Sequence, residues 1–221
     1  VARLYDFEDG QLHFSHFVAP DECIVLFMAE GNAGISRATA EGIREIVAQH
    51  PNCVPVDSAL LQEWFDDLVW GPDKVAREDE RIRTTRNVNR TTEISADWST
   101  INDIYEAVLP RIRAEIKGIT LLGGHSSHSY INGTNMYFNY FYDLIDCEPQ
   151  EENDKYYLPI IGIICEETLR RGGSIVHHHG IGKARAPWVK DEYGTSYPML
   201  ETLKHAFDPN GIMNMGTIIP R

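Results

Sequence analysis

Residues 133–142 read Gly133-Thr134-Asn135-Met136-Tyr137-Phe138-Asn139-Tyr140-Phe141-Tyr142. Aromatic residues of this kind favour β-strands. Successive side chains of a strand point to opposite faces of the sheet. Tyr137, Asn139 and Phe141 therefore share one face, and the apolar side chains between them share the other. We predict a strand over 134–143.

The regions around this strand give an irregular mixture of elements. Strands are predicted over 1–5, 12–18, 23–30, 119–123 and 173–176 from short apolar runs. Helices are predicted over 36–49, 58–68 and 156–171, from residue 98 to about 117, and over 196–207. The charge-dense residues 74–90 and the acidic residues 147–154 are predicted to be loops or solvated surface. Because no glycine-rich phosphate loop follows a strand, we predict an α+β fold, an antiparallel β-sheet covered by helices.

Charge and composition restrict the class of partner. The 221 residues have a formal net charge of −13 and 43% hydrophobic content. This charge argues against a nucleic-acid partner, although a local basic pocket could still hold a small anionic substrate. Four widely spaced cysteines favour reduced thiols and a cytoplasmic location. The longest apolar run has the length of a strand, so no membrane-spanning helix is expected.

Three adjacent histidines form the second informative stretch, Gly172-Gly173-Ser174-Ile175-Val176-His177-His178-His179-Gly180-Ile181-Gly182-Lys183. Imidazole titrates near neutral pH and suits proton transfer, anion binding or metal ligation. The flanking glycines permit backbone conformations that other residues resist. A purely structural role for a single histidine is the alternative. For three histidines beside a glycine turn, a functional site is favoured.

Tyr137 is a candidate partner for this cluster, since a phenol facing an imidazole forms a proton-transfer pair. A metal site is the alternative, with His125 and His128 as further ligands. Adjacent histidines on an extended segment point to opposite faces, so at most two of the three could share an ion. Neither histidine segment contains a cysteine or carboxylate. We therefore predict no metal.

Two cations follow the histidine turn in this acidic chain, Lys183 and Arg185. The structural interpretation is a solvated loop. The functional interpretation is a clamp for a phosphate or carboxylate, which arginine binds bidentately.

Several of these motifs resemble one family of flavoproteins. Three segments are similar to the C-terminal domain of FAD-linked oxidases of the vanillyl-alcohol-oxidase type. They are residues 172–185, 199–204 and 208–214, and the last reads Asp208-Pro209-Asn210-Gly211-Ile212-Met213-Asn214. Within this group, the triple histidine and the Tyr137-Phe138 strand resemble the alkyl-dihydroxyacetone-phosphate synthases. Near the beginning of the sequence, Arg3-Leu4-Tyr5-Asp6 resembles the start of this domain in the family.

The resemblance implies an organisation and a set of site residues. Residues 1–221 would be a single C-terminal, substrate-binding cap domain, and the FAD-binding domain would lie upstream of this sequence. His178 would be the catalytic base, with Tyr137 in the same site. His177 and His179 would line the substrate phosphate or the flavin edge. Arg77 is expected to bind the substrate, and Arg81 is the alternative for this role. His179 and Asn214 are expected to bind the cofactor.

The resemblance also implies an activity. We expect FAD-dependent, alkylglycerone-phosphate-synthase-like chemistry of ether-lipid synthesis, in which an acyl group is exchanged for an alkyl group. The alternative is an FAD-dependent oxidase or dehydrogenase of an alcohol or 2-hydroxy acid, although the carboxylates typical of the hydroxy-acid branch are missing after Gly124 and before His179. A binding module without catalysis is a third hypothesis. The expected partner is a phosphorylated or carboxylate-bearing small molecule, with a lipid substrate, peripheral membrane contact and a homodimer left open.

Overall fold

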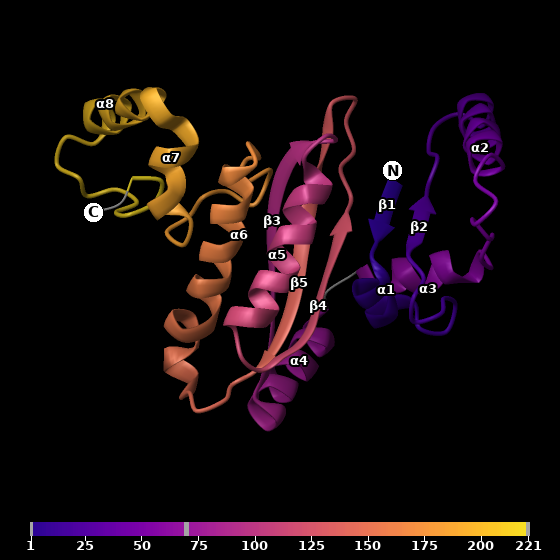
Figure 1. Cartoon of the computed structure of the whole chain (residues 1–221), viewed down its shortest axis with the longest axis horizontal. Coiled ribbons are helices and arrows are strands. Elements are labelled where there is room, and N and C mark those ends of the chain that lie inside the picture. The colour runs from indigo at the N-terminus through magenta and orange to yellow at the C-terminus, as the bar shows by residue number, and fades with distance from the viewer. Residues whose placement is uncertain (1, 69–70, 220–221) are drawn as a thin grey trace.

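The computed structural model describes residues 2–68 and 71–219. Within them, five strands form one antiparallel sheet in the order β2-β1-β4-β5-β3 (Figure 1). The predicted α+β fold is confirmed. The strands are β1 (Ala2–Tyr5), β2 (Ile24–Phe27), β3 (Asn87–Asp97), β4 (Ile119–Ser126) and β5 (Gly133–Asp143). The helices are α1 (Phe7–Phe14), α2 (Ala33–Val47), α3 (Ala59–Leu68), α4 (Pro72–Thr85), α5 (Ile101–Glu115), α6 (Leu158–Arg170), α7 (Val189–Tyr193) and α8 (Tyr197–Phe207).

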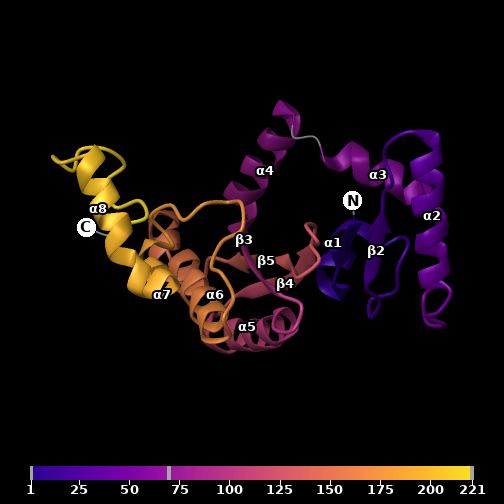
Figure 2. The same ribbon diagram turned by 90° about the horizontal axis from the view of Figure 1, so that it is seen from above.

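One face of the sheet is covered by α5 and α6 and forms the main core (Figure 2). Three β5 side chains on this face are fully buried and Met136 is partly buried, on the side that the alternation in the sequence predicted. Their helix partners recur at the spacing of a helical stripe. The buried side chains are Phe138, Tyr140 and Tyr142 of β5, Ile104, Val108 and Ile112 of α5, and Ile160 and Ile164 of α6.

The opposite face of the sheet carries α1 and α4. The Asp6 carboxylate caps α1 and also accepts the backbone N–H of Gly124 on β4, at 2.5 Å, and the Tyr105 hydroxyl, at 2.6 Å. On α4, Arg81 lies over the ring of Phe141, 5.5 Å from its centroid. The side chains of this face are more polar and less covered, so this face presents the candidate site.

Two predicted strands and two predicted loops need correction. Residues 12–14 end α1 and residues 15–17 form a turn instead of a strand, because Asp6 is an N-cap that starts a helix at Phe7. Residues 74–90 contain α4 and the start of β3. Glu78 and Arg81 are paired at 2.5 Å on α4, and such i,i+3 pairs stabilise a polar helix.

The segments around the histidine stretch also differ from prediction. Residues 93–97 are the end of β3, and the helix predicted from residue 98 begins at Ile101. The predicted strand at 173–176 is reduced to two backbone hydrogen bonds between Ser95 and Ser174, of 3.0 and 2.8 Å. Residues 147–154, predicted as loop, contain the short helical turns Pro149–Glu151 and the start of Asn153–Tyr157.

The C-terminal residues form a separate projection beyond α6 (Figure 1). It consists of α7, α8 and the segment that follows, and α8 exposes Met199, Leu203 and Phe207. None of the described helices is long and apolar enough to cross a membrane.

Candidate functional site

A row of four side chains crosses the sheet at the site. Antiparallel register pairs Tyr5 on β1 with His125 on β4, His125 with Tyr137 on β5, and Tyr137 with Glu93 on β3. Directly opposed residues lie on the same face of an antiparallel sheet. The His125 and Tyr137 rings are stacked, with centroids 4.4 Å apart. The site is therefore built on rigid strands.

Glu93 anchors the histidine loop to this row. Its buried Oε1 atom accepts the backbone N–H groups of His177, His178 and His179, each at 2.9 Å. Burial is the largest influence on this carboxyl and raises its pKa, but the three N–H donors outweigh it, and the pKa of Glu93 is lowered overall. Converging backbone N–H groups of this kind form a nest for an anion, here occupied by a side chain of the same protein.

The second carboxylate oxygen of Glu93 has a different environment. Oε2 is buried and has no hydrogen-bond partner among the described residues. It lies 3.7 Å from Nδ1 of His178 and 3.9 Å from Nδ1 of His177. The loop therefore has a buried negative charge beneath two of its imidazole rings.

The rings of the loop bind one another and two tyrosines. The Tyr137 hydroxyl is 2.7 Å from Nε2 of His178, so the predicted pairing of these two residues is confirmed in its geometry. Nδ1 of His178 is 2.8 Å from Nδ1 of His177, and Nε2 of His177 is 2.8 Å from the Tyr130 hydroxyl. Burial raises the pKa of Tyr137, which keeps its phenol protonated and able to donate.

His128 completes the cluster. Its ring lies 4.8 Å from that of His178, and its Nδ1 is 2.9 Å from the Ser127 hydroxyl. Burial and the nearby His178 and His177 lower the pKa of His128. One ligand atom each from His128, His177 and His178 could lie around a metal ion, since these atoms are within 4.8 Å of one another. Because the His177 and His178 nitrogens are already hydrogen-bonded, we interpret the cluster as a proton-transfer network, and the absence of a metal stays a prediction.

A buried contact between Asp9 and His125 supports the row. Asp9 on α1 is fully buried, and its carboxylate is 2.6 Å from Nδ1 of His125 and accepts the Asn139 amide at 2.9 Å. Burial raises the pKa of Asp9, but the bonds from His125 and Asn139 outweigh it, so the pKa is lowered overall. Asp9 thus fixes His125, on which Tyr137 stacks.

The other predicted contacts with the substrate or cofactor have mixed outcomes. His179 is exposed beside Tyr137, with ring centroids 5.3 Å apart. Burial lowers the pKa of His179 despite the opposing effect of Glu93. Arg185, predicted to bind a substrate phosphate or carboxylate, is held by groups of the protein itself. Its side chain is buried, donates to the Ile175 carbonyl at 2.8 Å and lies 3.9 Å from Oε1 of Glu93.

The remaining candidates lie outside the hydrogen-bonded cluster. Lys183 is exposed in the loop after the histidines, and Asn214 is exposed in the C-terminal segment. Arg77 is exposed on α4, whereas Arg81 binds Glu78 and the Asn87 side chain. Within residues 2–68 and 71–219, no hydrogen bond or ion pair joins Lys183, Arg77 or Asn214 to the cluster.

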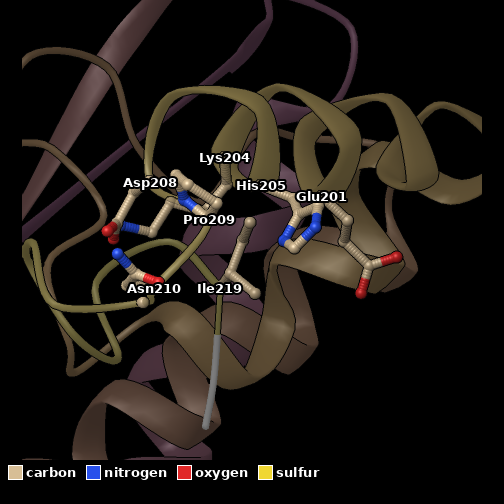
Figure 3. A pocket seen from close by; sticks show the side chains of 8 residues that line it. Glu201, Lys204, His205, Asp208, Pro209, Asn210 and Ile219 are labelled. Atoms are coloured by element: carbon tan, nitrogen blue, oxygen red, sulfur yellow. The ribbon is translucent and has the colours of Figure 1, made fainter.

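An open pocket occurs elsewhere, at the end of α8 (Figure 3). Its wall includes Lys204 and Asp208, and the Asp208 carboxylate also accepts the backbone N–H groups of Ile212 and Met213, at 3.0 Å each. The Lys204 ammonium and these N–H groups lower the pKa of Asp208 to about 2. Asp208 therefore closes a turn, and none of the predicted site residues lines this pocket.

Sequence reasoning missed Glu93, Tyr130 and Asp9 as site residues. Their partners are 84, 47 and 116 positions away along the chain. An acidic residue inside a strand is a signal that would have found Glu93, but only after residues 87–97 had been recognised as a strand. Asp9 lies in α1, between the predicted strands 1–5 and 12–18, where no helix was predicted.

Comparison with known proteins places this geometry in a family. Residues 10–218 match the model of the C-terminal domain of FAD-linked oxidases. The chain belongs to this family. Its match covers all of the site described above except Tyr5, Asp6 and Asp9, and membership of this family implies FAD as a cofactor.

Relatives of known sequence extend the likeness. The chain is 59% identical over 223 aligned residues to an uncharacterized FAD-linked oxidoreductase, YgcU, of Escherichia coli strain K12, and spans 46% of that protein. It is 34% identical over 100 residues to the alkyldihydroxyacetonephosphate synthase of Trypanosoma brucei brucei, covering 45% of this chain and 16% of the synthase. This family domain is thus similar over its whole length to part of an oxidoreductase, and only distantly similar to the synthase.

A solved structure agrees in fold. The structure of an alkyldihydroxyacetonephosphate synthase superposes on this chain with a TM-score of 0.59 at 16% identity. The superposition covers all of this chain and 38% of the synthase chain. At this identity the likeness concerns the fold alone.

Proposed function

We propose that this domain binds the substrate and removes a proton in an FAD-linked oxidoreductase that acts on an alcohol or a 2-hydroxy acid. The observation that carries the proposal is the 2.7 Å contact between the Tyr137 hydroxyl and Nε2 of His178 on an accessible surface. The His178 side chain is 39% exposed, so a substrate can reach it. A general base must lie within hydrogen-bond reach of the proton that it takes.

The histidine loop fits a planar cofactor at its edge. Gly180 and Gly182 have positive φ angles of 80° and 59°, and a Cβ at either position would meet no atom within 4 Å. A flat ring can therefore approach the backbone there. We assign edge contacts to His179 and to Asn214. When bound, FAD supplies the acceptor for the two electrons that the substrate loses.

The residues of the chain have separate roles in this scheme. His178 takes the proton on Nε2, and Tyr137 orients the substrate oxygen with its hydroxyl. Glu93 holds the backbone of the loop so that the ring of His178 needs no rearrangement during the reaction. Preorganisation of this kind lowers the cost of reaching the transition state. Lys183 is an exposed cation next to the loop, and we assign to it the binding of a substrate carboxylate or phosphate. We assign the same role to Arg77, which requires that α4 close on the site.

Alkyl-for-acyl exchange on an acyl-dihydroxyacetone phosphate is the second candidate. It is favoured by the 34% identity to the synthase over 100 residues and by the triple histidine. In that reaction His178 would take the proton from a carbon atom, with no net oxidation.

Anaerobic mixing of the FAD-loaded protein with candidate substrates tests the two reactions. Bleaching of the flavin by an alcohol or a 2-hydroxy acid supports the oxidoreductase. Exchange of a fatty alcohol into acyl-dihydroxyacetone phosphate without bleaching supports the second candidate. Neither result with any substrate, in protein that is fully loaded with FAD, would contradict both.

A further inference from the structure

An unbroken chain of hydrogen bonds runs from the base to the surface. The Tyr137 hydroxyl meets Nε2 of His178 at 2.7 Å, Nδ1 of His178 meets Nδ1 of His177 at 2.8 Å, and Nε2 of His177 meets the Tyr130 hydroxyl at 2.8 Å. Tyr130 is 53% exposed. The chain thus begins at the reacting pair and ends in solvent.

One assignment of hydrogens satisfies every link with neutral groups. Tyr137 donates its O–H to Nε2 of His178, His178 donates Nδ1–H to Nδ1 of His177, and His177 donates Nε2–H to the Tyr130 oxygen. The tautomers follow from the network of partners. Each group then accepts on the side of Tyr137 and donates on the side of solvent, which is the arrangement that proton hopping requires.

Tyr130, at the outer end of the hydrogen-bond chain, is held in place. The Trp98 indole N–H donates to the Tyr130 carbonyl at 3.0 Å, and the Tyr130 N–H donates to the Gly133 carbonyl at 2.8 Å. An exposed tyrosine held only by packing would sample several rotamers. Here its backbone is tied to the end of β3 and the start of β5, which keeps the hydroxyl beside His177.

A buried negative charge lies beneath the two histidines in the middle of the hydrogen-bond chain. The unpartnered Oε2 of Glu93 is 3.7 and 3.9 Å from the two Nδ1 atoms that bond each other. A positive charge on either imidazole is stabilised by this carboxylate, because the interaction of charges is strong where water is excluded. The other charged group near this carboxylate is Arg185, 3.9 Å from Oε1, and His128 and His179 flank the rings.

We propose that His177 and Tyr130 form the outlet through which the proton taken by His178 reaches solvent, with Glu93 as the counter-charge. This inference rests on the proposed role of His178 as the base. The oxygen of a bound substrate accepts the hydrogen bond of the Tyr137 O–H, and one proton then enters at the freed Nε2 of His178. The Nδ1–H proton of His178 passes to Nδ1 of His177, the Nε2–H proton of His177 passes to the Tyr130 oxygen, and the Tyr130 O–H proton passes to water. One proton enters, one leaves, and no electrons move.

The outlet matters when the site is filled. A substrate on His178 covers the exposed part of its ring and blocks direct proton exchange with water. Tyr130, on the turn between β4 and β5, is on the far side of His177 from Tyr137. The proton therefore has a way out that does not cross the substrate.

Nuclear magnetic resonance of the FAD-loaded protein with ¹⁵N-labelled histidine tests the chain of bonds without a substrate. We expect scalar coupling between the two Nδ1 atoms across their shared proton. The exchange of that proton with water should slow by at least about tenfold in Tyr130→Phe, which keeps the ring but removes the hydroxyl. Tyr193→Phe, an exposed tyrosine on α7, is the matched control and should change nothing. Absence of the coupling, or equal exchange rates in both variants, would overturn the outlet.

Stopped-flow measurement with a pH indicator links the outlet to turnover. With an alcohol or 2-hydroxy acid that bleaches the flavin, proton release should lag behind bleaching in Tyr130→Phe and in His177→Gln but not in Tyr193→Phe. Loss of bleaching in His178→Gln confirms the base independently. If His178→Gln is inactive while the Tyr130 and His177 variants release protons in step with bleaching, the outlet is wrong and the base is retained. If His178→Gln bleaches normally, the proposed function itself fails.

Discussion

Glu93 and Tyr137 lie directly opposite each other on β3 and β5, and each binds a different part of His178. The Glu93 carboxylate accepts the backbone N–H of His178 at 2.9 Å, and the Tyr137 hydroxyl meets its ring nitrogen at 2.7 Å. Neighbouring strands of the sheet therefore fix both the backbone and the ring of one residue. Sites built on strands are held more precisely than sites built on loops alone.

Replacing His178 should remove most of the activity. His178→Gln keeps a polar side chain but removes the imidazole, and loss of a general base costs ~10²–10⁴-fold in rate. His205→Gln, on the exposed surface of α8, should leave the rate unchanged. The measurement is the rate of anaerobic flavin reduction by a substrate of the FAD-loaded protein, and similar rates for the two variants would make the cluster structural.

Removing the Glu93 carboxylate should destabilise the protein. Glu93→Ala leaves three partly buried N–H donors without their acceptor, and each unsatisfied group that is buried costs about 1–3 kcal/mol. We expect the free energy of unfolding to fall by at least about 3 kcal/mol in urea denaturation.

A matched substitution of a buried polar side chain, at Thr168, should not lower the free energy of unfolding. The hydroxyl of Thr168 on α6 is buried without a hydrogen-bond partner among the described residues. Thr168→Val keeps the branched shape and removes this polar group, so the free energy of unfolding should stay equal or rise by about 1 kcal/mol. A loss in Glu93→Ala no larger than the change in Thr168→Val would contradict the anchoring role of Glu93.

Asp9 and His125 should be energetically coupled. The contact between the Asp9 carboxylate and Nδ1 of His125, 2.6 Å long, is almost entirely excluded from solvent, so removing one partner leaves the other without this bond. Asp9→Asn and His125→Gln should each destabilise the chain, and the double variant should be less affected than their sum by about 1–3 kcal/mol. A double-mutant cycle by urea denaturation measures this coupling. Strict additivity would show that the pair contributes nothing beyond packing.

The sequence predicted the side of β5 that faces the core, because alternation along a strand is a local property. It also predicted that Tyr137 and His178 meet, since both motifs matched one family. The charged helix α4 was missed because its stability comes from i,i+3 ion pairs and from contact of Ile82 with the core, which an apolar stripe does not reveal.

The support of the site was much harder to predict. Glu93 binds a loop 84 residues away and Asp9 binds a histidine 116 residues away, and such contacts depend on sheet register. Arg185 shows the reverse case. Its sequence context left open a solvated loop or an anion clamp, whereas the structure buries its side chain against the Ile175 carbonyl and Glu93.

Acid should weaken the histidine region in two stages. Burial lowers the pKa of both His128 and His179. A group with a depressed pKa binds more protons when unfolded, so its contribution to stability is complete above the unfolded pKa, about 6.5 for histidine, and is lost as the pH falls through the folded pKa. Glu93 and Asp9 also have lowered pKa values. Their contributions are complete above about 4.3 and 3.9 and are lost below, as the pH falls through their folded values.

Urea denaturation across a pH series checks both stages. The double variant His128→Gln, His179→Gln should flatten the fall between neutral pH and about pH 5, while leaving the steeper fall at lower pH. An unchanged slope near neutrality in this variant would show that these two histidines do not contribute to the pH dependence.

Two glycine substitutions should change stability in opposite directions. Gly133 begins β5, and a Cβ there would lie 2.3 Å from the backbone oxygen of Ala96 on β3. Gly133→Ala must therefore separate the two strands, at a cost of about 1–3 kcal/mol. Gly42 lies inside α2, where a Cβ would meet nothing within 4 Å. Gly42→Ala should stabilise the chain by about 1 kcal/mol, because alanine favours a helix more than glycine does.

The same pair of variants separates stability from site geometry. Asn135 follows Gly133 on β5, and its side-chain oxygen accepts the backbone N–H groups of Ser127 and His128, at 3.1 and 3.0 Å. Separation of β3 from β5 should therefore also displace His128 and the Glu93–Tyr137 pair. We expect the imidazole resonances of the cluster to shift in Gly133→Ala and to stay in place in Gly42→Ala. Unchanged resonances in Gly133→Ala would show that the close contact with Ala96 does not set the spacing of the site.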